Sequence, residues 1–133
     1  MGHITYSDSV KSITKDQLQG FFIGWIKTPP PSVHLKALQN SEHVILAIDS
    51  DTSNVVGFIN ALSDKTMSAY ISTLEVLPKY QSRGIGSELM QRMLKKLENM
   101  YMIDLLCEAD MQAYYERFGM KKTTAMMLRN MHE

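Results

Sequence analysis

The 133-residue sequence predicts a mixed α/β domain in which antiparallel strands come first and a parallel crossover follows. Three observations lead to this class. Two apolar runs, 43–48 and 55–62, flank a polar turn, as in a β-hairpin. A third strand-like run, 68–77, ends at a proline and a glycine-containing turn. An amphipathic helix then leads to another strand, and a helical connection favours parallel pairing of the strands it joins.

The elements before the hairpin are predicted as one strand and two helices. Thr14 is a candidate N-cap, and apolar residues recur at helical spacing over 18–26. The three prolines at 29–31 must end that helix, because proline lacks the backbone N–H that a helix needs. Ser32 is the candidate N-cap of a second, short helix ending near Asn40.

After the third strand, a long helix presents one apolar stripe, and a strand follows over Met102–Cys107. Asp110 is the candidate N-cap of another helix, which runs to Phe118 and ends at Gly119. Met120–Leu128 is predicted as the last strand. The apolar stripe of the long helix consists of Leu89, Met90, Met93, Leu94 and Leu97.

Methionine is unusually frequent, with eleven residues in the chain. We interpret those on the long helix, together with Met126 and Met127 in the predicted last strand, as adaptable core filler. No cysteine or histidine accompanies them at ligand spacing, so we expect no metal site.

Composition limits the function classes. The length suits a single domain over residues 1–133. Fourteen basic residues offset fourteen acidic ones, so we expect no nucleic-acid partner. No apolar run reaches the roughly 18 residues of a membrane span, so we expect no membrane partner. Cys107 is the only cysteine, which favours a cytoplasmic location and a small buried side chain.

The most informative segment joins the third strand to the long helix at Gln81–Ser87. The first amides of a helix lack intrahelical partners and carry the positive end of its dipole, and glycines allow a ligand to approach. Between Lys79 and Lys96 there are five basic residues and one acidic residue. The pattern Gln-x-x-Gly-x-Gly matches neither the dinucleotide fingerprint nor the Walker motif. The residues leave two interpretations open, a phosphate cradle and a tight packing turn.

Two segments resemble the GNAT N-acetyltransferase family. Val76–Gly86, with its Gln-Ser-Arg-Gly-Ile-Gly run, looks like the acetyl-CoA signature of that family. Ala113–Met120, which reads Ala-Tyr-Tyr-Glu-Arg-Phe-Gly-Met, is similar to the family pattern Leu-Tyr-Glu-Lys-Leu-Gly-Phe. The resemblance implies a GNAT-like fold with a bulged fourth strand, a parallel central pair that splays apart, and flanking helices.

The resemblance also implies how acetyl-CoA, the co-substrate, is held. Leu74 and Val76 would offer backbone groups to the pantetheine arm. Backbone amides of the turn would bind the pyrophosphate. Arg83 would add a charge-assisted contact to it, and a solvated surface charge is the equally weighted alternative for this residue. The cofactor residues expected in the turn are Gln81, Ser82, Arg83, Gly84, Ile85, Gly86 and Ser87.

For catalysis, the resemblance makes Tyr115 the proton donor to the leaving thiolate and the Val76 amide a candidate to polarise the thioester carbonyl. The general base is open. Tyr70 stands where some members of the family place a glutamate. Glu75 and Glu108 could act through a water, although a structural or solvated carboxylate is the simpler interpretation of each.

The expected acceptor is a primary amine of a small molecule or peptide. Trp25 and Tyr70 are candidate residues of its pocket, and the alternative for Trp25 is a buried core aromatic. The resemblance also makes a homodimer possible. The competing function is a non-catalytic acyl-CoA-binding module.

Overall fold

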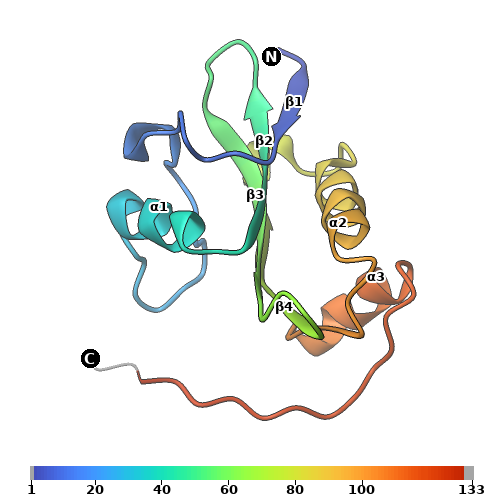
Figure 1. The fold of residues 1–133 in the computed structure, drawn as a ribbon. Coiled ribbons are helices and arrows are strands. Elements are labelled where there is room, and N and C mark those ends of the chain that lie inside the picture. The colour runs from blue at the N-terminus through green and yellow to red at the C-terminus, as the bar shows by residue number, and fades with distance from the viewer. Residues whose placement is uncertain (1, 131–133) are drawn as a thin grey trace.

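The computed structural model describes residues 2–130 and contains one five-stranded sheet with helices on both faces (Figure 1). The strand order is β1-β2-β3-β4-β5; β1 to β4 are antiparallel neighbours, and β5 is parallel to β4. The predicted mixed α/β class is therefore confirmed. The strands are β1 (Ile4–Ser7), β2 (His43–Asp49), β3 (Val55–Ser63), β4 (Ser68–Val76) and β5 (Met102–Leu105). The α-helices are α1 (Pro31–Gln39), α2 (Ile85–Lys96) and α3 (Gln112–Glu116), and the 3-10 turns are η1 (Lys15–Gln17), η2 (Pro78–Tyr80) and η3 (Ala109–Met111).

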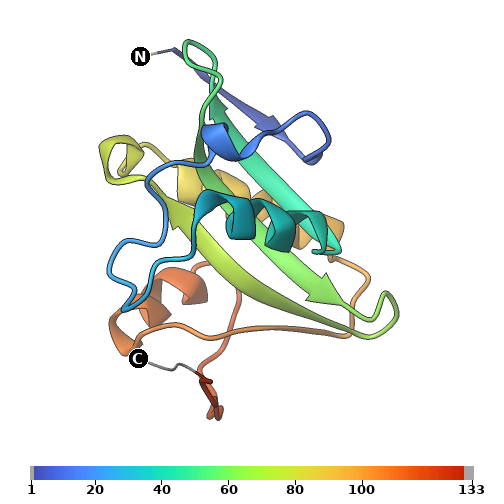
Figure 2. The same cartoon turned by 90° about the vertical axis from the view of Figure 1, so that its left-hand side faces the viewer.

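Each face of the sheet carries its own apolar cluster. Along β2, Ile45 and Ala47 belong to the cluster beneath α2, whereas Val44 and Leu46 belong to the cluster beneath α1 and the N-terminal loop. Figure 2 shows α1 lying across one face of the sheet, with α2 behind it. Because both faces are covered, β2 reads as a continuous apolar run instead of an alternating one.

The apolar stripe of α2 packs on the sheet as expected. Leu89, Met90 and Met93 are fully buried in the cluster on that face, and so is Leu97 directly after the helix. The interpretation of Met90 and Met93 as core filler is thus confirmed. No helix within residues 2–130 is long and apolar enough to cross a membrane.

The helix predicted over Thr14–Ile26 is wrong. Thr14 begins only the single 3-10 turn η1, and the chain then takes left-handed backbone angles at Gly20, Phe22 and Gly24 (φ 90°, 68° and 86°). Successive positive φ values cannot continue a right-handed helix, so the segment is a folded loop. Trp25 is 51% exposed, which excludes its interpretation as a buried core residue.

The other helix boundaries differ in smaller ways. Helix α1 begins at Pro31 after the N-cap Pro30, not at Ser32, because proline suits the first helical position. Asp110 makes no capping bond and lies in η3, which leads into the short helix α3. Gly119 follows α3 with φ 89°, as a helix-ending glycine should.

The strand predicted over Met120–Leu128 is also wrong. Residues 120–130 form no strand, and every residue from 121 to 130 is exposed. Met126 and Met127 are 97% and 68% exposed, so they are not core filler. The expectation of a buried Cys107 is likewise wrong, because its side chain is exposed.

The two parallel strands separate halfway along β4. Their register runs from Ser68 opposite Met102 to Ile71 opposite Leu105 and then stops, whereas β4 continues along β3 to Val76. A register shift against β3 at Asn60/Ala61 leaves Ser72 as the extra residue of a bulge in β4. The predicted bulge and splayed pair are both present, and the second half of β4 has an open edge.

A buried histidine lies at the centre of the cluster on the α1 face. His34 is 3% exposed, and its ring lies 4.4 to 5.4 Å, between centroids, from the rings of Phe21, Phe22 and Phe58. Neither ring nitrogen has a hydrogen-bond partner within residues 2–130. Burial therefore lowers the pKa of His34 to about 4, and the ring is neutral at pH 7.

This burial predicts acid sensitivity of the fold. Between the ordinary histidine pKa of 6.5 and the folded value of about 4, the unfolded chain binds a proton that the folded chain does not. Stability should fall as the pH drops through that window, by about 1–2 kcal/mol at pH 5 relative to pH 7. Urea unfolding of the His34→Phe variant should show a flatter dependence over this range. An unchanged slope in the variant would contradict the assignment.

Candidate active site

The open edge of β4 exposes backbone hydrogen-bonding groups. Leu77 N–H donates to the carbonyl oxygen of Val56 at 2.9 Å, which fixes the side of β4 that bonds to β3 at this point. In an antiparallel ladder the bonded positions alternate. The N–H and C=O groups of Leu74 and Val76 therefore point to the opposite edge, from which β5 has departed.

The open edge leads directly into the predicted anion turn. Ser82 and Gly84 adopt left-handed angles (φ 63° and 81°), and Gly84 is the N-cap of the twelve-residue helix α2. The side-chain amide of Gln81 donates to the Val76 carbonyl oxygen at 2.9 Å and ties the turn to the strand end. The free amides at the start of α2 thus lie beside the end of β4, an arrangement suited to an anion.

A cavity of about 360 Å³ lies between this turn and α3. Seven of the nine predicted cofactor residues line it, whereas Leu74 and Arg83 do not. The guanidinium of Arg83 lies 5.8 Å from the centre of the Tyr80 ring. The predicted residues at the cavity are Val76, Gln81, Ser82, Gly84, Ile85, Gly86 and Ser87.

Three residues of this cavity, Tyr80, Tyr114 and Arg117, were not among the predicted cofactor residues. The Tyr114 hydroxyl lies 3.5 Å from Ser87 Oγ, and the Arg117 guanidinium stacks 5.1 Å from the Tyr114 ring centre. A Cβ atom added at Gly86 would lie 3.1 Å from the Tyr114 hydroxyl, so glycine leaves room here. The signal was present in the second motif, where Arg117 takes the place of the family's basic residue.

A buried hydrogen bond anchors the turn from below. The Tyr80 hydroxyl donates to Asp49 Oδ2 at 2.6 Å, and both side chains are buried. The bond lowers the pKa of the Asp49 carboxyl and raises the pKa of the Tyr80 hydroxyl. It connects the end of β2 to η2, so the strand-to-helix turn is hydrogen-bonded to the sheet.

Tyr115 lines a second cavity, of about 270 Å³, where β5 ends. The ring centres of Tyr114 and Tyr115 are 5.1 Å apart. These adjacent residues of α3 nevertheless line two different cavities. Burial, followed by the charges of Tyr114 and Cys107, raises the pKa of Tyr115 to about 12. The phenol is therefore protonated at pH 7. Leu105, Leu106 and Cys107 share this cavity.

Glu75 lies on the face of β4 opposite to α2, where its carboxylate binds the N-terminal loop. Its two carboxylate oxygens accept the Phe22 N–H at 2.9 and 3.0 Å, and one of them also accepts the Ile23 N–H at 3.4 Å. This carboxylate supplies the partner that a helix would otherwise have provided for those amides. The structure therefore gives Glu75 a positioning contact.

The two predicted acceptor residues lie apart from these cavities. Trp25 packs against Phe22, with 4.7 Å between ring centres, and Tyr70 on β4 is 36% exposed. Neither lines either cavity described above. A further cavity of about 400 Å³ runs along the loop held by Glu75, and His34 forms part of its wall.

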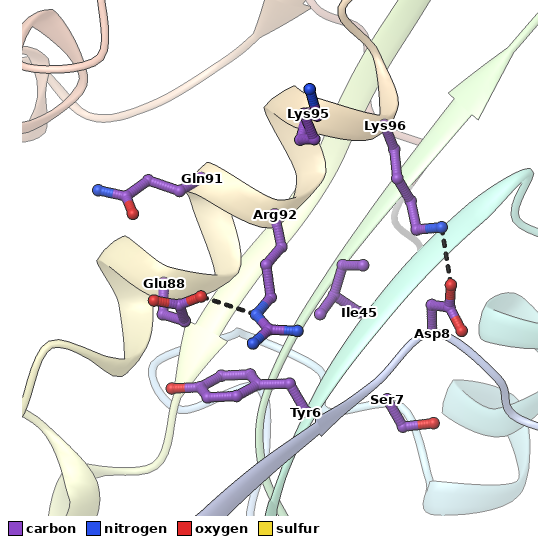
Figure 3. A pocket seen from close by; sticks show the side chains of 9 residues that line it. All are labelled: Tyr6, Ser7, Asp8, Ile45, Glu88, Gln91, Arg92, Lys95 and Lys96. Carbon is purple, nitrogen blue, oxygen red and sulfur yellow. Dashed lines mark hydrogen bonds and ion pairs between the residues drawn. The ribbon is translucent and has the colours of Figure 1, made fainter.

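The largest of these cavities, about 670 Å³, lies between α2 and β1 (Figure 3). Arg92 bonds Glu88 at 2.7 Å and stacks on Tyr6, and Lys96 bonds Asp8 at 2.8 Å. Three of the five basic residues counted around the turn, including Lys95, thus lie at this cavity between α2 and β1 and pair with carboxylates. The basic residue at the cavity of the turn is Arg117, which directly follows α3. Within residues 2–130, no three His, Cys, Asp or Glu side chains gather as a metal site.

Comparisons with known proteins agree with this arrangement. Residues 10–120 match the family model of the acetyltransferase (GNAT) family. The chain is 30% identical over 123 residues to the uncharacterized N-acetyltransferase ycf52 of Porphyra purpurea, covering 88% of this chain and 70% of that protein. The chain therefore belongs to the GNAT family of N-acetyltransferases.

Solved structures support the same assignment. A protein of Deinococcus radiodurans R1, provisionally assigned as an acetyltransferase, superposes with a TM-score of 0.92 at 40% identity, over 98% of this chain and 94% of that one. The GNAT-family acetyltransferase SP0256 of Streptococcus pneumoniae gives a TM-score of 0.78 at 27% identity, over 98% of this chain and 100% of that one.

The Glu75 contact predicts a stability effect. Glu75→Gln removes one acceptor oxygen and the charge that strengthens these bonds, so the free energy of unfolding should fall by about 1–2 kcal/mol. Urea denaturation measures the change, and proteolysis within residues 20–31 should accelerate. Glu108→Gln is the matched control, because Glu108 is exposed and its side chain makes no hydrogen bond or ion pair within residues 2–130. Equal losses in both variants would contradict this role.

Proposed function

We propose that the chain, acting as a single domain, transfers an acetyl group from acetyl-CoA to a primary amine of a small molecule or peptide. The observation that carries the proposal is the continuity of two features. The open backbone edge at Leu74 and Val76 leads into the free amides at the start of α2. An extended amide-bearing arm that ends in a pyrophosphate needs these two surfaces in this order.

The residues present fit acetyl-CoA, which would supply an activated acetyl group as a thioester. The Val76 N–H, directed to the open edge, would bond the arm or the thioester carbonyl. The amides from Gln81 through Ser87 would hold the pyrophosphate, in a turn where Gly86 leaves room beside Tyr114. Arg117 adds a cation to the same cavity, and a guanidinium suits phosphate oxygens.

The proposed chemistry uses Tyr115 as the proton donor. As a neutral amine forms the new carbon–nitrogen bond and the carbon–sulfur bond breaks, Tyr115 Oη gives its proton to the sulfur. The proton released by the amine nitrogen restores the phenol through water, so protons balance. Burial supports this role, because a pKa of about 12 keeps the phenol protonated until the thiolate develops.

The acceptor amine would approach from the side of the N-terminal loop. Glu75, next to Val76 in β4, binds that loop, and a cavity runs along the loop. We keep Trp25 and Tyr70 as proposed contacts of the acceptor. We propose that Glu75 acts by positioning the loop, although a role as base through a water stays a prediction. An exposed lone thiol at Cys107 supports the cytoplasm as the compartment, and a homodimer is the proposed assembly.

The fit at Gly86 gives a binding test. In Gly86→Ala the new methyl group would lie about 3.1 Å from the Tyr114 hydroxyl and disturb both walls of the cavity. We expect the Kd for CoA, measured by calorimetry, to rise about tenfold. Adding Tyr114→Phe should recover part of the loss by removing the hydroxyl. Gln91→Ala, on the outer surface of α2, is the control. Unchanged affinity in Gly86→Ala would exclude the pyrophosphate from this turn.

The role of Tyr115 gives a catalytic test. Tyr115→Phe should lower kcat by about 100-fold or more while the Kd for acetyl-CoA stays within about twofold of wild type. A thiol-release assay with an amine library supplies kcat. Tyr114→Phe is the matched control, because it removes a hydroxyl from the adjacent residue and should change affinity more than kcat. Tight acetyl-CoA binding by the wild type without turnover of any amine would favour the non-catalytic binding module.

A further inference from the structure

The cavity that holds Tyr115 also holds two primary amines of the chain itself. Lys121 and Lys122 line this cavity of about 270 Å³ together with Tyr115. Only the end of α3 and the turn at Gly119 separate the two lysines from Tyr115 along the chain. The proposed proton donor and two candidate acceptor amines therefore share one cavity.

The start of the segment that carries these lysines is fixed in the fold. Met120 packs against the apolar cluster beneath α2, and Tyr115 packs against the same cluster. Lys121 and Lys122 directly follow this anchored methionine, so their long side chains stay near the cavity. Residues 121–130 are exposed and pair with no strand within residues 2–130, so the backbone of the two lysines can adjust.

Neither lysine is engaged by another group of the described chain. Within residues 2–130, the Nζ atoms of Lys121 and Lys122 form no hydrogen bond or ion pair. Lys96, by contrast, bonds Asp8 at 2.8 Å. An ammonium group must lose a proton to water before its nitrogen can attack a carbonyl carbon, and an ion pair opposes that loss. The two lysines of the cavity are therefore available to react.

A carboxylate in the same cavity can take the proton that the nitrogen loses on reaction. Gln112, Tyr115 and Glu116 occupy positions i, i+3 and i+4 on one face of α3, and all three line the cavity. The Glu116 side chain forms no hydrogen bond or ion pair within residues 2–130. A proton donor, a proton acceptor and an amine thus lie at one cavity, and acyl transfer to an amine uses all three.

We propose that the chain acetylates itself within one copy, at Lys121 or Lys122. The neutral lysine nitrogen forms a bond to the acetyl carbon of acetyl-CoA and gives a proton to Glu116 through water. The carbon–sulfur bond breaks, and Tyr115 Oη gives its proton to the sulfur. The proton held by Glu116 then restores the phenol through water, so the products are Nε-acetyllysine and the free CoA thiol. The inference rests on the proposed acetyl transfer and names a substrate for it.

Attachment to the same chain favours these lysines over amines in solution. A tethered group has an effective concentration on the order of millimolar when its tether is short. The route of approach also differs from that of an external acceptor. A thioester carbonyl is planar and has two faces; the external amine is proposed to come from the N-terminal loop, whereas the lysines come from the side of Tyr115.

Mass spectrometry of the full chain incubated with acetyl-CoA tests the proposal. Each acetyl group adds about 42 Da, and peptide mapping assigns the lysine that carries it. We expect Lys121 or Lys122 to react at least about tenfold faster than Lys11 and Lys15, because the reaction is intramolecular. Lys11 and Lys15 are exposed and lie outside the cavity, so they report spontaneous acetylation. The rate per molecule should not change with protein concentration.

Two variants test the chemistry of the cavity. Tyr115→Phe should lower the rate at the two lysines to that of the reference lysines. Glu116→Gln should lower it about tenfold or more, while the Kd for CoA stays within about twofold of wild type. Asp110→Asn is the matched control, because it removes an exposed carboxylate beside α3 that does not line the cavity. Replacing both Lys121 and Lys122 with Arg should abolish the modification.

Three outcomes would overturn the proposal. If the wild type acetylates amines of a library while Lys121 and Lys122 react no faster than Lys11, self-acetylation is wrong and the proposed acetyl transfer stands. If acetyl-CoA binds but no amine of any kind reacts, the proposed acetyl transfer is wrong as well. A rate per molecule that rises in proportion to protein concentration would exclude transfer within one copy.

Discussion

The site depends on the separation of two parallel strands. If β5 continued beside β4 beyond Ile71, the backbone groups of Leu74 and Val76 would be used in the sheet. Because β5 leaves, these groups face an opening that ends at the first turn of α2. The bulge at Ser72 falls where the strands part, and bulges increase local twist, which helps two neighbours to diverge. An interruption of regular pairing, which costs stability, thus produces an open backbone edge.

Two polar contacts hold the walls of this opening. Below the turn, Tyr80 bonds Asp49 and secures η2 to the end of β2. On the other face, Glu75 bonds the Phe22 amide and secures the N-terminal loop to β4. Both contacts join residues far apart in sequence, so the folded sheet must form before either wall is in place. Both also use a carboxylate as acceptor, which makes them stronger than bonds between neutral groups. The strand-to-helix turn and the N-terminal loop are therefore held by two separate contacts.

Local patterns predicted the regular parts of the fold well and the irregular parts poorly. The strands β2, β3 and β4 and the helix α2 follow directly from apolar runs and from helical spacing, since burial on the sheet rewards the same pattern. The helix over Thr14–Ile26 fails because Gly20, Phe22 and Gly24 take left-handed angles, and Glu75 of β4 bonds the Phe22 amide. The last strand fails for a different reason. Residues 121–130 are exposed and pair with no strand within residues 2–130, so no buried face rewards the strand-like pattern.

The sequence by itself determined the class of the fold and the position of the glycine-containing turn, because glycine spacing and apolar periodicity are local properties, and two of its segments carried the resemblance to the family. It also placed Tyr115 in a recognisable motif. Only the tertiary structure decided which groups meet. In the fold, three basic residues of α2 line a separate cavity, where they form ion pairs with carboxylates. Arg117 and Tyr114 lie at the turn instead. It turned Glu75 toward the Phe22 amide and left Trp25 exposed. These outcomes depend on contacts between distant segments, which one-dimensional spacing does not contain.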